Sequence, residues 1–318
     1  MIYNSRVIKE KNPLVSVIVT NYNYEFFVSE AIDSILSQTY SNIEILIIDD
    51  GSTDGSVPII EKYAHSHENI KFISQKNKGV VYARNLGLEK SSGEFFVFID
   101  ADDTVPETFI QNMLSTMLSE NADVVFCDLK LLDKMDGVIE IEAQSIEGFI
   151  HFIPTPICQL VRKSIVKNIR FDEKLNGLAH EDNDFFFGLF LNGAKFVKSD
   201  THYNYRIHGN GRSPALNTQK HYKARLYILE KYKNSHKLLN NALIDTLIYK
   251  DAEIKKWHEV ADERYHLIKE KDVEISKVND EHNKRYSDLV NSFRYKAGSF
   301  VTLPFYGLKK ILKNKRKK

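Results

Sequence analysis

Short apolar runs alternate with amphipathic segments over the first 128 residues of the chain. The apolar runs predict five strands, at residues 15–20, 43–48, 71–73, 95–99 and 123–127. Between them, apolar residues recur at helical spacing, as in Phe27, Ala31 and Ile35. A further helix is expected over residues 106–119, opened by Pro106. Strands that alternate with helices indicate βαβ units, so we expect an α/β fold with a mostly parallel, doubly wound sheet flanked by helices.

The pattern changes after residue 128. Residues 129–218 contain aromatic runs, prolines and polar clusters, which predict a loop-rich lobe over the rim of the sheet, where a second substrate would bind. We group this lobe with residues 13–128 into one domain, 13–218. Residues 219–290 contain few Gly or Pro, and charged residues interrupt their apolar heptad register. This segment is expected to be a helical extension, as a hairpin or a weak coiled coil through which two copies could associate.

The charge is concentrated at the C-terminus. The chain has a net charge of +1, but residues 289–318 carry nine Lys or Arg and no acid, which leaves 35 basic against 43 acidic residues before them. Aromatic and aliphatic residues lie among these lysines, so we expect 291–318 to be a basic amphipathic tail that binds an anionic membrane surface. A solvated tail is the alternative. Nucleic acid is not an expected partner, because phosphate contacts do not require an apolar face.

Other features of the composition concern the compartment. No window approaches the apolar length of a membrane-spanning helix, and residues 1–6 lack the apolar core of a signal peptide. The two cysteines, Cys127 and Cys158, are too few for a disulfide framework. We therefore expect a cytoplasmic protein, peripheral on the inner face of the cell membrane.

Three acids follow the most apolar run. Asp100, Asp102 and Asp103 come directly after Phe95–Ile99, at the expected carboxyl end of a buried strand, where open α/β sheets bind ligands. Carboxylates this close repel one another unless a cation lies between them. Mg²⁺ and Mn²⁺ prefer oxygen ligands, so the stretch predicts a metal site for a diphosphate.

Three other strand ends would meet the same edge of a parallel sheet, at Thr20–Tyr22, Asp49–Asp50 and Arg84–Asn85. Tyr22 offers a face on which a base can stack, and Asp50 can accept a hydrogen bond from a ring N–H. Arg84 offers a charged fork for phosphate. Each residue also has a structural explanation: Asp50 as a helix cap, Arg84 as a surface residue and Tyr22 as a loop aromatic.

The order and spacing of these segments resemble the GT-A nucleotide-sugar transferases of glycosyltransferase family 2. The matching segments are 15–23, 49–54, 77–79 with 83–87, 100–103, Glu181-Asp182 and Tyr205-Arg206-Ile207-His208. The resemblance covers about residues 13–215 and implies a GT-A fold and a Mn²⁺- or Mg²⁺-dependent inverting transferase. It also implies residue roles: Thr20, Tyr22 and Asp50 for the nucleobase, most often uracil; Arg84 for the diphosphate; Asp100 with Ala101 for the ribose or the metal; and Asp102 with His208 for the metal.

Inverting sugar transfer needs a general base that takes the proton of the acceptor hydroxyl. In residues 179–187 a polar run leads into an apolar helix, so either Asp182 or Asp184 could simply be an N-cap. The resemblance implies that Asp182 is the base and that Glu181 is a structural or acceptor-orienting neighbour. His208 lies in a Gly-rich stretch, either as an exposed loop residue or as a metal ligand on a loop that closes over the nucleotide.

Two other functions compete with sugar transfer. Residues 100–105 also match the Asp-x-Asp-x-Thr/Val signature of haloacid dehalogenase-type phosphatases, in which Asp100 would be the nucleophile. That motif normally follows the first strand of its fold, whereas at least three strands are expected before it here. A non-catalytic, transferase-like scaffold is the second alternative. We expect transfer of a sugar from a nucleotide donor, UDP-sugar above all, to a glycan or lipid-linked acceptor in surface polysaccharide synthesis.

Overall fold

The computed structural model describes residues 12–133, 137–142, 145–150, 155–207 and 218–235, and single residues between 271 and 288. The chain divides into two compact units, Met1–Thr246 and Leu247–Lys318. In the second unit the described positions between 271 and 288 are helical. The tail at 291–318, most of the extension at 219–290 and His208 lie outside the described residues.

The first half of the chain forms a parallel sheet. Its strands are β1 (Val15–Asn21), β2 (Ile43–Asp49), β3 (Ile70–Ser74) and β4 (Phe95–Asp100), in the order β3-β2-β1-β4. The chain adds β2 and β3 on one side of β1 and then returns to place β4 on the other. The carboxyl ends of β1 and β4 therefore flank the point where strand order reverses, which is where ligands bind in open α/β sheets.

The second half extends the same sheet. β7 (Leu160–Arg162) lies antiparallel between β4 and β5 (Val124–Asp133), and β5 also pairs with β6 (Gly137–Ile139) and, in parallel, with β8 (Phe196–Ile207). The expected mostly parallel α/β fold is confirmed. Where the structure describes it, the region expected to be loop-rich contains the strands β6, β7 and β8. The long β8 has polar and half-buried positions and lacks the apolar run of a central strand.

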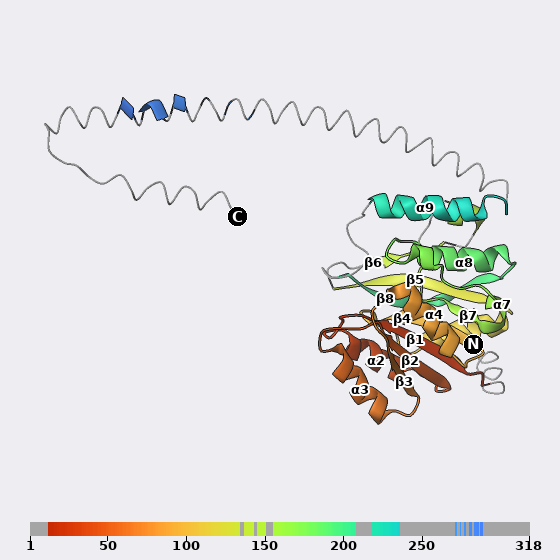
Figure 1. Ribbon diagram of the computed structural model, residues 1–318. Helices are drawn as coiled ribbons and strands as arrows, with labels where there is room; N and C mark the ends of the chain where they lie inside the picture. Colours follow the sequence, from red (N-terminus) through yellow and green to blue (C-terminus); the bar gives the residue numbers. More distant parts are fainter. Residues whose placement is uncertain are drawn as a thin grey trace. The chain divides into compact units, whose positions relative to one another are not determined.

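Helices cover both faces of the sheet (Figure 1). One core contains apolar side chains of α2 (Val28–Leu36), α3 (Ser56–Ser66) and α5 (Phe109–Ser119). The other contains those of α4 (Val80–Lys90), α6 (Ile146–Ile150), α7 (Lys163–Val166), α8 (Glu181–Leu191) and α9 (Thr218–Tyr232). Strand residues alternate between the cores, so that Val17 enters the first and Ile18 the second.

The structure changes the expected start of α5 and shows to which unit α9 belongs. Pro106 does not open α5, because the helix begins at Phe109, whose N–H donates to the Pro106 carbonyl. α9 belongs to the first unit, where Ala224, Ile228 and Leu229 are buried in the second core. Among the described residues, no helix has both the length and the hydrophobicity needed to span a bilayer.

Candidate active site

Thr20 is the penultimate residue of β1, and Asp100 ends β4, at the switch point. They are paired in the register of β1 and β4, and the Thr20 hydroxyl donates to Asp100 Oδ1 at 3.2 Å. The Ala101 N–H donates to the Thr20 carbonyl at 3.3 Å. On the other side of β1, the Asp50 N–H donates to the Asn21 carbonyl at 2.9 Å. The convergence of these strand ends on one edge of the sheet is therefore confirmed.

Arg84 is a buried residue of α4 and not a surface residue. It is 5 % exposed, and its guanidinium bonds to Glu181 Oε1 at 2.9 Å and Asp100 Oδ1 at 3.5 Å. Burial would lower the pKa of Arg84, but the charges of Asp100 and Glu181 raise it. Its Nε has no hydrogen-bond partner among the described residues. Arg84 thus joins the end of β4 to the start of α8 and keeps one buried N–H for a ligand.

Asp182 lies in the first turn of α8. The N-cap is His180, so neither Asp182 nor Asp184 caps this helix. Burial, followed by the negative charge of Glu181, raises the pKa of Asp182 to about 7, whereas the charge of Arg84 lowers it. A carboxylate with such a pKa is ionised in half of the molecules near neutral pH and can accept a proton effectively.

Asp50 stabilises the loop that leads into α4. Asp50 is 2 % exposed, and its carboxylate accepts hydrogen bonds from Gln75 Nε2 at 2.8 Å, from the Lys78 N–H at 2.8 Å and from the Gly79 N–H at 2.7 Å. Asp50 therefore holds the segment before α4 and does not cap a helix. A carboxylate has about four acceptor positions, so one stays available for a nucleobase N–H. Tyr22 follows β1 and is half-buried at the same edge.

The acidic loop after β4 is held from β8. The Arg206 N–H donates to Asp103 Oδ1 at 2.7 Å, and Arg206 Nε donates to the Asp102 carbonyl at 2.8 Å. Burial, followed by the charges of Asp102 and Asp100, raises the pKa of Asp103 well above its usual range. A bound cation would relieve this repulsion.

The donor set fits a hard divalent cation. Asp100 and Asp102 offer carboxylate oxygens, the ligand type that Mg²⁺ and Mn²⁺ prefer, next to a third carboxylate whose ionisation their charges already oppose. Within the described ranges, no three His, Cys, Asp or Glu side chains form a ready set of metal ligands. The other expected ligand, His208, lies outside these ranges.

Comparisons of the sequence identify the family. The model of glycosyl transferase family 2 matches residues 16–170. An uncharacterized glycosyltransferase of Haemophilus influenzae is 32% identical over 208 residues, which cover 61% of this chain and 77% of that protein. The chain belongs to glycosyltransferase family 2. EpsH of Bacillus subtilis is 33% identical over 216 residues, which cover 62% of this family 2 chain and 62% of EpsH.

A solved structure agrees with the fold. S. aureus TarS 1–349, in complex with UDP-GlcNAc, superposes with a TM-score of 0.62 at 23% identity, over 73% of this chain and 71% of that one. At this identity the likeness concerns the fold alone. The GT-A-like, mostly parallel sheet flanked by helices is thus confirmed for this family 2 member.

Tyr203 and Arg206 are residues of this family 2 site whose contacts sequence reasoning missed. The Asp100 N–H donates to the Tyr203 hydroxyl at 3.2 Å. Arg206 also bonds to Asp133 at 2.8 Å and to Glu30 at 2.5 Å, and so links the acidic loop to β5 and α2. The sequence pointed to Arg206 through the matching segment Tyr205–His208 and to Tyr203 only through the aromatic run on β8, and neither signal carries information about their partners.

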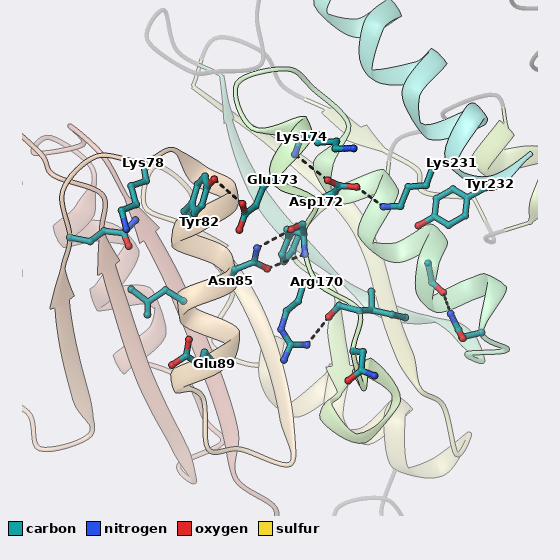
Figure 2. A pocket seen from close by; sticks show the side chains of 17 residues that line it. Lys78, Tyr82, Asn85, Glu89, Arg170, Asp172, Glu173, Lys174, Lys231 and Tyr232 are labelled. Carbon is teal, nitrogen blue, oxygen red and sulfur yellow. Dashed lines mark hydrogen bonds and ion pairs between the residues drawn. The ribbon is translucent and has the colours of Figure 1, made fainter.

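A groove of about 1010 Å³ lies between α4, residues 168–174 and the ends of α8 and α9, and Gln75 and Lys78, which bond to Asp50, also line it (Figure 2). Its polar groups largely bond to one another. Tyr82 donates to Glu173 at 2.9 Å, Asn85 bonds to the backbone of Phe171, and Lys231 bonds to Asp172 at 2.9 Å. These pairs leave few groups for a ligand, so we do not place the sugar donor there.

Proposed function

We propose that this family 2 member is a metal-dependent inverting glycosyltransferase, with Asp182 as the general base. The observation that carries the proposal is the position of Asp182, beside the Arg84–Glu181–Asp100 cluster and with a pKa near neutrality. The proposed base and the proposed donor site thus share one buried arginine.

In the proposed transfer, one bond forms and one breaks at the anomeric carbon of the sugar. The acceptor hydroxyl gives its proton to a carboxylate oxygen of Asp182 while its oxygen forms a bond to the anomeric carbon of the sugar. The bond between that carbon and the phosphate oxygen breaks on the opposite face, and the nucleoside diphosphate leaves with the electron pair. The buried guanidinium of Arg84, next to Asp100, would stabilise the negative charge that develops on the leaving diphosphate.

The proposed donor is a UDP-sugar. Thr20, Tyr22 and Asp50 would hold the base and Arg84 the diphosphate, while Asp100 with Ala101 would contact the ribose. Support comes from the position of these residues at the strand ends, from the spare acceptor of Asp50 and from the UDP-GlcNAc complex of TarS, whose fold this chain shares.

Mn²⁺ or Mg²⁺ would be held by Asp102 and His208, with Asp100 close by. A bound cation would supply charge neutralisation at the leaving diphosphate. The chain itself contributes the orientation of the ligands, because Arg206 fixes the backbone at Asp102 and Asp103.

The acceptor is proposed to be a glycan or a lipid-linked sugar in surface polysaccharide synthesis, at the inner face of the cell membrane. The lobe of residues 129–218 would bind it, the tail at 291–318 would hold the enzyme on anionic lipid, and the extension at 219–290 would allow self-association. These proposals rest on the sequence, namely the basic, apolar tail and the interrupted heptads.

A binding and turnover panel tests the function. UDP-, GDP-, CMP- and dTDP-sugars are assayed with and without Mn²⁺, on wild type, Asp102→Ala and Asp182→Asn. We expect metal-dependent UDP binding that Asp102→Ala abolishes, whereas Asp182→Asn keeps binding and loses turnover by roughly 10²- to 10⁴-fold. Lys233→Met, in the turn that follows α9, is the control and should behave as wild type, because Lys233 pairs with Glu230.

The two alternatives give different results in this panel. Membership of family 2 decides against the phosphatase, in which Asp100 would attack a phosphate monoester; here Asp100 also bonds to Arg84 and Thr20. Hydrolysis of a phosphate ester without nucleotide binding would nevertheless refute the transferase. Nucleotide binding without turnover on any donor would favour the non-catalytic scaffold.

A further inference from the structure

α9 lies along the helix that carries the proposed base (Figure 1). Ala224, Ile228 and Leu229 of α9 are buried in the same core as the phenylalanines of α8. At the end of α9, the ring of Tyr232 packs edge-on against Phe187, with centroids 4.9 Å apart. α9 begins beyond residue 170, where the match to the family model ends.

Lys231 connects α9 to the first turn of α8. Its Nζ bonds to Asp184 Oδ1 at 2.9 Å and Oδ2 at 2.8 Å, and the Asp184 side chain is only 1% exposed. The same Nζ bonds to Asp172 Oδ2 at 2.9 Å, as Figure 2 shows. Burial alone would favour a neutral Asp184, and its pKa is raised in spite of the Lys231 charge. Lys231 is thus the cation that this buried carboxylate contacts.

Asp184 and Asp182 occupy opposite sides of the helix. Two residues correspond to a rotation of roughly 200° in an α-helix, so a contact to Asp184 acts on the face away from Asp182. Glu181, next to the base, bonds to Arg84, which in turn bonds to Asp100 at the end of β4. The first turn of α8 is therefore held from both sides, by Arg84 and by Lys231.

The start of α8 has no side-chain cap that could hold it instead. His180, the N-cap, has a φ of 63° and no capping hydrogen bond from its side chain. This left-handed conformation is costly for a residue other than glycine and persists where the surroundings enforce it. His221 of α9 contributes here as well, since its Nδ1 lies 3.2 Å from His180 Nε2.

We propose that Lys231 is a positioning residue of the transfer reaction: through Asp184 it fixes the first turn of α8 and so the place of Asp182 beside Arg84 and Asp100. The inference rests on the proposed role of Asp182. It implies that the segment after residue 218, and not only the domain matched by the family, is needed for a fast chemical step.

The test compares four variants of the full chain with UDP-sugar and acceptor. Lys231→Met removes the charge, Lys231→Arg keeps it, and Lys231→Met with Asp184→Asn removes both charges of the pair. Lys233→Met removes a nearby lysine, which pairs with Glu230 and makes no hydrogen bond or ion pair with α8 among the described residues. Circular dichroism and thermal melting establish the folded fraction at the assay temperature.

We expect Lys231→Met to lower kcat roughly 10- to 100-fold with the KM for the donor within about twofold, since the donor site lies on other elements. Lys231→Arg should stay within about threefold of wild type, and Lys233→Met should equal it. The double variant leaves no unpaired buried charge, so it should fold even where Lys231→Met does not, and its kcat should stay at least about tenfold below wild type.

A double variant that is folded and as fast as wild type would overturn the inference, as would a loss confined to the donor KM. In both cases the wild-type turnover leaves the proposed function intact. A wild type that transfers no sugar from any donor would overturn the proposed function, and the inference with it.

Discussion

Glu181→Gln removes a negative charge next to Asp182 and keeps the shape of the side chain. In the wild type, burial and then the Glu181 charge raise the pKa of Asp182 from 3.8 to about 7, which corresponds to roughly 4 kcal/mol against ionisation. Without the Glu181 charge the repulsion disappears, and Arg84 loses a competing partner. Both effects lower the pKa of Asp182.

The assay is the pH dependence of kcat/KM for the acceptor at saturating donor and metal. A base must be ionised to act, so kcat/KM should fall as the pH drops through about 7 in wild type and at a lower pH in Glu181→Gln. Gln keeps the volume of Glu, so packing changes are small. If the acid limb lies at the same pH in both proteins, the Glu181 charge does not raise the pKa of Asp182. A wild-type limb below about pH 5 would refute the raised pKa of Asp182 itself.

The same ionisation affects stability. The pKa of Asp182 is higher in the folded than in the unfolded chain, so the cost of ionising it appears as the pH rises above 3.8 and is complete above about 7. Asp182→Asn removes this cost. Thermal melts should show a variant more stable than wild type at pH 8, by up to about 4 kcal/mol, and of equal stability near pH 4. A variant less stable at pH 8 would contradict the raised pKa.

Three further predictions concern residues outside α8. Burial alone would raise the pKa of Glu44, but hydrogen bonds from Lys71, Ser16 and Ser92 hold it at about 2. Glu44→Gln should therefore lower the free energy of unfolding by about 3 kcal/mol at pH 7 and leave it unchanged below about pH 2, measured by urea unfolding. Arg206→Met should raise the Mn²⁺ concentration needed for half-maximal activity roughly 10- to 100-fold, measured by Mn²⁺ titration, because the Asp102 carbonyl loses its hydrogen bond from Arg206. Asp50→Asn has one acceptor oxygen for three N–H donors, so isothermal titration should show UDP affinity at least about tenfold weaker, and unchanged binding would contradict its place in the donor site.

The elements that lie within one window of the chain could be predicted from the sequence. The strands β1 to β4 and the helices between them appear as apolar runs and helical spacing, since burial on a sheet or helix face repeats every two or 3.6 residues. β7 and β8 escaped prediction because one is short and the other alternates polar with half-buried positions. Their place in the sheet depends on pairing with β5, far away in the sequence.

The chemistry of the site divides in the same way. The sequence alone determined which residue types occur at the strand ends. It therefore predicted a carboxylate-rich edge suited to a cation and a diphosphate. The partners of these groups were decided by the tertiary structure. Arg84 meets Glu181 across 97 positions and Arg206 reaches Glu30 across 176, distances over which no local periodicity carries information. The pKa of Asp182 and the hold of Lys231 on α8 follow from burial and from those long-range contacts, and both exist only in the folded chain.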